Sequence, residues 1–223
     1  MHADYADDGQ HDVCEFLECF LESVRFRECV RGAYGIWGHL QTDVPSATHV
    51  DRLFGFVLET RRRCGLTVRS WYERSFFLRL LPLRERGGAC TVAEMYLASF
   101  VPTLTQVACG SCGLNAEHAS QVRMFTCPNV LFVQVQRIPG VPRVPVHPEE
   151  HLDLPGCPPL RLDAVVYHAG RSVANSGHYT CACRDTAGRF RCYADAWPVV
   201  PVDPELGQVE PLARYLLLYL YLD

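Results

Sequence analysis

The first pattern along the chain is a stripe of apolar side chains with helical spacing. Within residues 10–29, apolar residues recur in steps of three and four, as on one face of an amphipathic helix. The stripe consists of Val13, Phe16, Leu17, Phe20, Leu21 and Val24. Residues 7–9, Asp-Asp-Gly, precede it and suit a helix start. We therefore predict a helix over residues 10–29, followed by a turn-rich segment over residues 32–48.

From residue 53 onward the period changes to the alternation that is typical of β-strands. The alternating segments are Leu53–Cys64, Ser75–Leu83, Met124–Arg137, Leu160–Val166, His178–Cys183, Arg189–Tyr193 and Tyr215–Leu222. Residues 91–100 return to helical spacing, and Thr91 and Glu94 predict a capping box at their start. A proline-rich connection covers residues 139–159. One helix followed mostly by strands predicts an α+β fold with an antiparallel sheet.

Composition and charge narrow the class of protein. The 223 residues are 48% hydrophobic and 21% charged, as in a folded globular chain. The net charge of -4 argues against a nucleic-acid partner, because phosphate binding needs a basic face. We expect no membrane partner, because residues 215–222 form the longest apolar run and a spanning helix takes about 20 residues. We expect no signal peptide, so the 12 cysteines indicate reduced thiols in the cytosol or nucleus.

The segment SGHYTCAC, residues 176–183, carries the most chemical information. His178 follows a glycine at the start of a predicted strand, and imidazole titrates near pH 6.5, so it can accept and return a proton. The next predicted strand leads to Asp195, a carboxylate that can orient such a ring. This pattern is typical of a catalytic base with its partner on adjacent strands. A packed or surface histidine is the alternative, since the chain has nine.

Five sequence blocks occur in an order that is known from one enzyme family. The blocks are GQHDVCEFL (Gly9–Leu17), LFGFVLETRRRC (Leu53–Cys64), CPNVLFVQVQR (Cys127–Arg137), VVYHAGRSVANSGHYT (Val165–Thr180) and RYLLLYLY (Arg214–Tyr221). In this order they resemble the ubiquitin-specific protease family of cysteine deubiquitinases. The resemblance implies part of a papain-like cysteine-protease architecture. Residues 1–50 would end the thumb, residues 51–137 would form β fingers with a short helix, and residues 138–223 would form an antiparallel palm.

The resemblance also implies roles for single residues. His178 would be the general base that deprotonates a catalytic cysteine, and His168 would be structural. The family places an Asp or Asn on the next strand, usually first in an acidic pair. Here that first position is Ala194 and the second is Asp195, so the assignment of Asp195 as the orienting residue stays open. The partner would be ubiquitin or a ubiquitinated protein, and by position its tail would contact Asp12, His11, Gly177 and Tyr179.

The catalytic-cysteine block of the family has no counterpart in this sequence. Cys14 lies inside the first block, on a helix whose other positions match, and we do not assign it as the nucleophile. We therefore expect the chain as written to be inactive, because acyl transfer needs that thiolate. Two explanations stay open: a truncated piece of an active deubiquitinase, which we favour, or a pseudoenzyme that binds ubiquitin or acts as a scaffold. Outside the family, the alternative is a zinc-knuckle interaction domain.

Metal binding is the last open question. Many members of the family hold a structural zinc ion in the fingers with two CxxC pairs. Here Cys109 and Cys112 form one pair, but the partner pair would begin at Cys64 and has Thr67 at its second position. Three thiolates leave the site one ligand short of the four that structural zinc takes. We expect no cofactor and a vestigial set of thiols, with zinc as the alternative.

Overall fold

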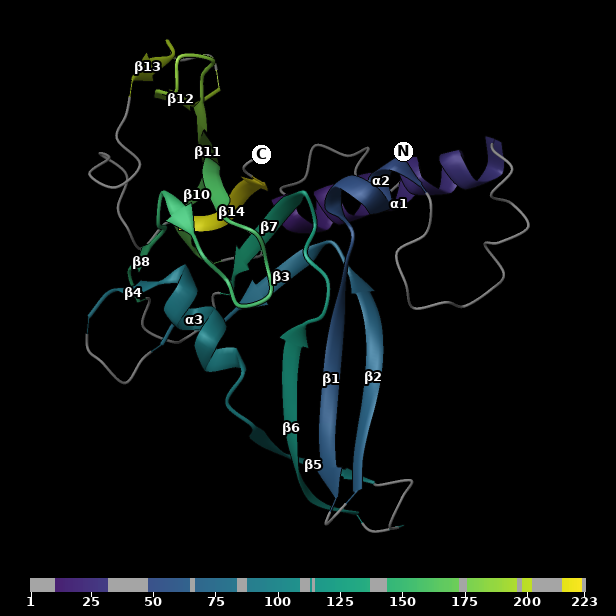
Figure 1. The fold of residues 1–223 in the computed structure, drawn as a ribbon. Coiled ribbons are helices and arrows are strands. Elements are labelled where there is room, and N and C mark those ends of the chain that lie inside the picture. Colours follow the sequence, from purple (N-terminus) through teal and green to yellow (C-terminus); the bar gives the residue numbers. More distant parts are fainter. Residues whose placement is uncertain are drawn as a thin grey trace.

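Two main sheets organise the fold (Figure 1). The computed structural model describes residues 11–31, 48–64, 67–83, 88–108, 113, 115–136, 144–172, 176–195, 198–201 and 214–221. The described helices are α1 (Val13–Arg31), α2 (His49–Phe54) and α3 (Val92–Ser99). The described strands are β1 (Phe56–Cys64), β2 (Thr67–Ser75), β3 (Phe77–Leu80), β4 (Cys90–Thr91), β5 (Thr103–Ala108), β6 (Asn115–Met124), β7 (Val130–Val135), β8 (Val146–His147), β9 (His151–Leu152), β10 (Leu160–Ser172), β11 (Ser176–Arg184), β12 (Phe190–Tyr193), β13 (Val200–Pro201) and β14 (Arg214–Tyr221).

The larger sheet is the platform for the candidate site. Its eight strands follow the order β13-β12-β11-β10-β14-β7-β3, with β9 beside β10. They pair antiparallel except for β3 with β7. The smaller sheet, β2-β1-β6-β5, is antiparallel and projects away from the larger one (Figure 1); we call it the finger sheet. An α+β fold with a mainly antiparallel sheet is confirmed, and the larger sheet takes in β3 and β7 from the range 51–137.

Helices lie on both faces of the larger sheet. α1 and α2 share one core cluster with Phe132 and Leu216, whereas α3 shares a second cluster with Leu131 and Leu217. Neighbouring residues of one strand enter different clusters because side chains alternate between the two faces. A strand that is covered on both faces is apolar throughout. This explains why residues 215–219 form a continuous apolar run rather than an alternating one.

The predicted capping box is confirmed at the start of α3. Thr91 Oγ1 accepts a hydrogen bond from the backbone N–H of Glu94 at 3.2 Å, and the Glu94 carboxylate accepts from the Thr91 N–H at 3.0 Å. The Glu149 carboxylate accepts from the N–H groups of Val92 and Ala93, both at 3.0 Å. These bonds satisfy backbone donors that have no partner within a helix. The bonds to Glu149 fix the start of α3 against the segment between β8 and β9 and give these N–H groups a partner.

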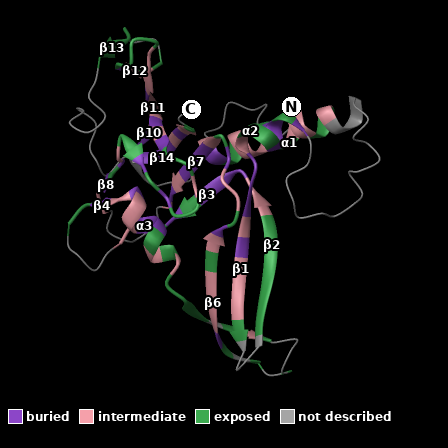
Figure 2. Cartoon of the chain, in the orientation of Figure 1, coloured by how far each residue is buried: buried purple, intermediate pink, exposed green. Residues whose placement is uncertain are grey.

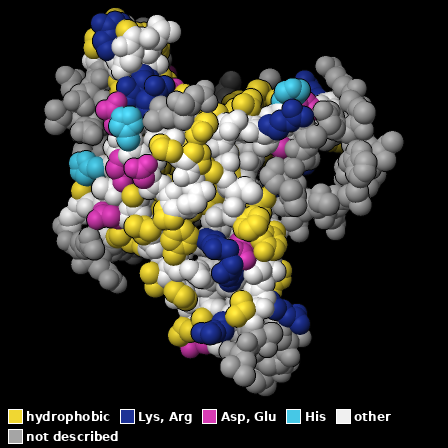
Figure 3. Space-filling model, viewed as in Figure 1, with side chains coloured by type: hydrophobic (Ala, Val, Ile, Leu, Met, Phe, Trp, Pro, Cys, Tyr) yellow, Lys and Arg dark blue, Asp and Glu magenta, His cyan; other side chains and the backbone are white. Residues whose placement is uncertain are grey.

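The finger sheet is polar and largely exposed. Figure 2 shows exposed residues along most of β2, and Figure 3 shows apolar side chains next to Lys or Arg side chains in this region. Its one deeply buried carboxylate among the described residues is Glu59, whose side chain is 2% exposed. Burial tends to raise the pKa of Glu59, but hydrogen bonds from Arg61 at 2.9 Å and Arg123 at 2.5 Å outweigh it and lower the pKa to about 2. The carboxylate thus ties β1 to β6.

The strand predictions need correction in two places. Leu53, expected to begin a strand, lies in the short helix α2. Thr48 begins this helix, because its side chain accepts a hydrogen bond from the Asp51 N–H at 3.0 Å. The finger-sheet strands β2, β5 and β6 were not predicted, because their residues are mostly polar or exposed and few face a core. The two-residue strands β4, β8, β9 and β13 were not predicted either.

The stripe of α1 was also predicted too broadly. Phe16 and Phe20 are 42% and 52% exposed, whereas Cys14 and Leu21 are 2% and 5% exposed. The buried face is therefore the one that includes Cys14 and Leu21, in contact with the larger sheet. The two phenylalanine rings stack on each other at 6.3 Å between centroids instead of entering the core.

Candidate functional site

His178 and Asp195 meet at one end of the larger sheet. His178 lies near the start of β11, and Asp195 follows the end of β12, the neighbouring strand. The Nε2 atom of His178 lies 3.2 Å from Oδ2 of Asp195, and the side chains are 51% and 68% exposed. The ring is thus open to solvent and is not part of the packed core. With Asp195 on Nε2, the Nδ1 atom is the ring nitrogen left to exchange a proton with a reacting group.

Asp195 reaches the imidazole through an unusual backbone conformation. Its φ of 44° is the only positive φ among the described non-glycine residues. The left-handed region costs roughly 1 kcal/mol for residues with a side chain, although Asp tolerates it better than most. An exposed ion pair contributes at most about 1 kcal/mol. The pair therefore adds little to stability, and a strained backbone that aims a carboxylate at an imidazole is typical of functional sites.

Gly177, directly before the imidazole, is packed against His168. The two strands β10 and β11 pair His168 with Tyr179, and their rings lie 4.6 Å apart. His168 is 5% exposed. A Cβ atom on residue 177 would lie 2.2 Å from Nε2 of His168 and 2.8 Å from the Ala169 carbonyl oxygen. Only glycine fits here, so this residue allows β11 to approach β10 where the base is held.

Asp12 connects the start of α1 to the same region. One of its carboxylate oxygens accepts hydrogen bonds from the N–H groups of Cys14 at 2.7 Å and Glu15 at 3.2 Å, which is an N-cap. The other accepts a hydrogen bond from the Tyr215 hydroxyl, to which Gln134 also donates at 3.0 Å. Both oxygens of Asp12 are therefore engaged in holding α1 on the sheet. His11, directly before it, is half-buried.

Tyr179 lies between these two groups of residues. Burial raises the pKa of Tyr179 to about 12, the nearby Asp12 carboxylate adds to the rise, and the backbone N–H of Val13 opposes it. Tyr179 thus faces the start of α1, while its neighbour His178 faces Asp195, as expected for successive residues of a strand. The structure brings together Asp12, Tyr179 and Gly177 at the start of β11, one residue away from the imidazole–carboxylate pair.

Cys14 is not arranged as a nucleophile. Its side chain is packed in the core cluster beneath α1 and is 2% exposed. Burial raises the pKa of the Cys14 thiol well above its ordinary value, and the Asp12 carboxylate adds to the rise. A catalytic thiol needs an accessible thiolate. Cys14 instead behaves as a small apolar core residue.

Of the three predicted metal ligands, only Cys64 lies in a described element. Cys64 ends β1, and Cys109 and Cys112 lie outside the described residues. Within the described residues, no group of three or more His, Cys, Asp or Glu side chains is arranged to hold a metal ion. The β1–β6 register ends at Arg63 opposite Ala119, so one further step places His118 across from Cys64. His118 is 7% exposed, and its buried Nε2 has no hydrogen-bond partner in the described part of the chain.

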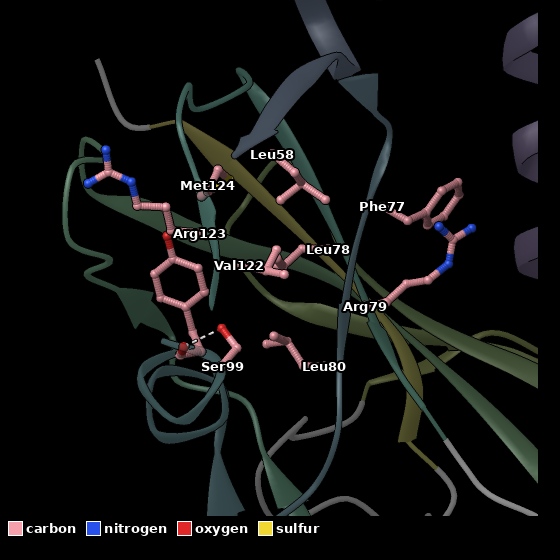
Figure 4. Close-up of a pocket in the computed structure, with 10 residues that line it drawn as sticks. Leu58, Phe77, Leu78, Arg79, Leu80, Ser99, Val122, Arg123 and Met124 are labelled. Atoms are coloured by element: carbon pink, nitrogen blue, oxygen red, sulfur yellow. Dashed lines mark hydrogen bonds between the residues drawn. The ribbon is translucent and has the colours of Figure 1, made fainter. Parts of the chain in front are cut away.

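A cavity of about 270 Å³ lies where the finger sheet meets β3 and α3 (Figure 4). Its wall is mostly apolar, with Leu58, Leu78 and Val122 pointing inward. The Ser99 hydroxyl donates a hydrogen bond to the Tyr96 carbonyl oxygen at 2.6 Å at its edge. The cavity contains none of the residues that the sequence singled out, and it is separate from the imidazole–carboxylate pair.

Two features of the site escaped the sequence reasoning. Tyr215 donates a hydrogen bond to Asp12. Because Tyr215 lies in an apolar run, the sequence did not indicate a polar partner for its hydroxyl. The pair Cys181 and Cys183 carries a recognisable signal, because a Cys-x-Cys spacing in a strand places both thiols on one face. Their sulfur atoms lie 4.0 Å apart.

Comparison with known protein families gives one extensive match. A family model described as ubiquitin carboxyl-terminal hydrolase matches residues 1–219. Among curated proteins, no match to the chain was found.

Solved structures share the fold. The chain matches the SAGA Ubp8/Sgf11/Sus1/Sgf73 DUB module bound to ubiquitin aldehyde with a TM-score of 0.72 and 18% identity, over 100% of this chain and 52% of that one. A form of the module with a substituted Ubp8, bound to monoubiquitin, gives 0.72 and 18%, over 100% and 51%. A yeast SAGA DUB module with a mutant Sgf73 gives 0.68 and 18%, over 86% and 46%. The chain thus spans about half the length of the solved chains that it matches.

Proposed function

The chain belongs to the ubiquitin carboxyl-terminal hydrolase family, and we propose that it supplies the base-bearing half of a thiol-dependent deubiquitinase. The family resemblance read from the five sequence blocks is thereby confirmed. The observation that carries the proposal is the 3.2 Å contact between His178 and Asp195 at the solvent-exposed start of β11. The reaction is hydrolysis of ubiquitin peptide or isopeptide bonds by a cysteine thiolate.

In the proposed mechanism, Asp195 orients the ring of His178 and stabilises its protonated form. His178 takes the thiol proton and later returns it to the leaving amine. An exposed ring that is held from one side by a carboxylate suits this role, because its other nitrogen stays accessible. The position usually occupied by the first acid of the pair is Ala194, and Asp195 takes over its function in this proposal.

The nucleophile is proposed to lie outside this sequence. In the two sequence blocks that carry Asp12 and His178, the one cysteine is Cys14, which is buried and kept as a thiol. We propose that the chain is a piece of an active enzyme that carries the cysteine block in another segment. The alternative is a pseudoenzyme that binds ubiquitin without hydrolysis. The nucleotide sequence 5′ of the first codon separates these two: an in-frame cysteine block supports the first, and a genuine start without one supports the second.

The ubiquitin tail is proposed to run past the start of α1 and β11. The residues near this path are Asp12, His11, Gly177 and Tyr179. Because His168 leaves no room for a side chain at residue 177, the strand carries no bulky group at that position. The negative charge of Asp12 suits the arginines of a basic tail, although its oxygens already accept hydrogen bonds from α1 and Tyr215. In this arrangement the scissile bond would reach His178. The cysteines whose side chains the structure describes are all free thiols. This fits a nuclear or cytosolic location.

We further propose that His118 is the fourth zinc ligand, in place of the cysteine that Thr67 replaces in the pair beginning at Cys64. Cys64, Cys109, Cys112 and His118 would together hold the ion, a three-thiolate, one-imidazole set that is common in structural zinc sites. Support comes from the buried Nε2 of His118, which has no hydrogen-bond partner among the described residues. His118 also lies one residue beyond the Arg63–Ala119 pair that ends the β1–β6 register. When bound, zinc would tie the ends of β1 and β6 together and take no part in hydrolysis.

A titration of ¹⁵N-labelled ubiquitin with this chain tests the proposed tail site. We expect chemical-shift changes at the C-terminal tail of ubiquitin. The Tyr179→Ala variant should weaken binding by about tenfold or more, as for the loss of a contact worth at least 1.4 kcal/mol. The Asp195→Asn variant is the matched control and should bind as the parent does, because Asp195 orients the base and does not contact the tail. Absence of shifts at the tail, or equal weakening by both variants, would refute the proposed site.

A further inference from the structure

Two thiols share one face of β11, three and five residues after His178. We propose that Cys181 and Cys183 form an oxidation site, a dithiol that reacts with hydroperoxides to give a reversible disulfide on the strand that carries the imidazole. The proposal concerns the chemistry of these thiols and does not depend on the deubiquitinase assignment.

The geometry brings the two sulfur atoms together. Residues i and i+2 of a strand point to the same face, and the thiol of Cys183 donates to the sulfur of Cys181 at 4.0 Å. Both side chains are partly exposed, so a small peroxide can reach them. The register places them opposite Val166 and Ala164 of β10. Reduced and adjacent, they need only a short movement to form a bond.

The surroundings decide which sulfur reacts first. The hydrogen bond from Cys183 lowers the pKa of Cys181 to about 7, against an opposing effect of burial. The same bond raises the pKa of Cys183, and burial and the nearby Asp163 carboxylate raise it further. Of the two thiols, Cys181 is therefore the one that ionises more readily, and Cys183 is its hydrogen-bond donor. This is the arrangement of an attacking sulfur with a resolving thiol beside it.

The reaction balances without any group from outside the named reactants. The Cys181 thiolate attacks one peroxide oxygen, the O–O bond breaks, and the leaving hydroxide takes up a proton to give water. The Cys183 sulfur then attacks the sulfenic acid, the S–O bond breaks, and a second water leaves as the disulfide forms. Two thiols lose two electrons and two protons, and hydrogen peroxide is reduced to two molecules of water.

The product must deform the strand. Two residues of a strand span roughly 6.7 Å between Cα atoms, whereas disulfides prefer about 5.5–6 Å and reach at most about 6.8 Å. Closing the bridge therefore shortens β11 and displaces Ala182, which is fully buried and pairs with Cys192 of β12. Since β12 leads to Asp195, oxidation should loosen the contact between Asp195 and His178. A strained disulfide of this kind is readily reduced again.

Cys192 is the control that the fold provides. It lies on the adjacent strand but pairs with Ala182, so it points to the opposite face from Cys181 and Cys183. Burial raises the pKa of Cys192. At pH 7, a pKa near 7 instead of 9.0 increases the thiolate population of Cys181 about fiftyfold. Lower intrinsic nucleophilicity takes back about eightfold, so Cys181 should be alkylated about sixfold faster than an ordinary thiol.

Peptide mapping after treatment of the chain with hydrogen peroxide tests the proposal. Trypsin cleaves after Arg171, Arg184 and Arg191, so the cysteine pair and Cys192 fall in separate peptides. We expect the peptide of residues 172–184 to lose the mass of two hydrogen atoms and to regain it with dithiothreitol. In Cys183→Ser, we expect a sulfenic acid at Cys181 that dimedone traps. The Cys192→Ser variant should behave as the parent does.

Three results would overturn the proposal. The first is oxidation of Cys192, or of Cys127 and Cys157, whose thiols also share a hydrogen bond, before the 172–184 peptide changes. The second is alkylation of Cys181 by limiting iodoacetamide at pH 7 no faster than that of Cys192. The third is a Cys183→Ser variant in which no sulfenic acid can be trapped at Cys181. All three measurements use the chain alone, starting from its reduced form, so their results do not depend on ubiquitin binding.

Discussion

Replacing Gly177 with alanine should destabilise the chain through one contact. The added Cβ would lie 2.2 Å from Nε2 of His168 and 2.8 Å from the Ala169 carbonyl oxygen. The imidazole of His168 cannot easily move away, because it is 5% exposed and lies 4.6 Å from the Tyr179 ring and 6.1 Å from the Tyr215 ring. Overpacking of this kind costs about 1–3 kcal/mol. Without the clash, the same substitution would stabilise the chain by about 0.4–1 kcal/mol.

Thermal and urea unfolding of the purified chain measure this effect. For a chain of this size, about 1–3 kcal/mol corresponds to a fall in Tm of roughly 3–10 °C. The matched control is the double variant Gly177→Ala/His168→Ala, in which the imidazole is absent and only the Ala169 contact remains. We expect the double variant to lose at least about 1 kcal/mol less than the sum of the two single variants. An unchanged or higher Tm for Gly177→Ala, or strictly additive losses, would refute the reasoning.

Three further outcomes follow from named contacts. Tyr215→Phe should lower the free energy of unfolding in urea by about 1–3 kcal/mol, because it removes the hydroxyl that joins Asp12 to Gln134; an unchanged midpoint would contradict this. Glu59→Gln should flatten the acid dependence of Tm. The fold lowers the pKa of Glu59 from 4.5 to about 2, so the ionised carboxylate stabilises the fold fully above pH 4.5, and this stabilisation is lost as the pH falls to 2. A variant whose Tm depends on pH as that of the parent does would contradict the prediction. Purified chain should contain one zinc ion per molecule by elemental analysis, retained in His118→Cys and reduced in His118→Ala; parent protein without zinc counts against the fourth ligand.

The sequence predicted those elements whose side chains face a core. The stripe of α1, the capping box of α3 and the apolar runs of β7, β10 and β14 all report contact with the larger sheet. It did not predict β2, β5 and β6, because a sheet with a solvent-exposed face needs few apolar residues. Charged pairs such as Glu59 with Arg123 hold this sheet together instead. It also missed α2, whose start depends on the side chain of Thr48.

The candidate site was predictable in its parts but not in its connections. The sequence motif identifies His178. Which carboxylate contacts its imidazole depends on the conformation of the turn after β12. That turn gives Asp195 a φ of 44° and brings its carboxylate to the imidazole. No periodicity encodes this conformation. The interaction of Tyr215 with Asp12, which joins residues 203 positions apart, is likewise set only by the packing of α1 on β14.

We propose that this chain holds the base of a thiol protease and that the nucleophile lies in another segment. Intact-mass spectrometry after incubation with a ubiquitin-vinyl electrophile tests it most directly. We predict an unchanged mass, because Cys14 is buried and protonated, and Cys181 and Cys183 lie on the face of β11 opposite to His178. A covalent ubiquitin adduct on Cys14, or on any other cysteine of the chain, would contradict the account.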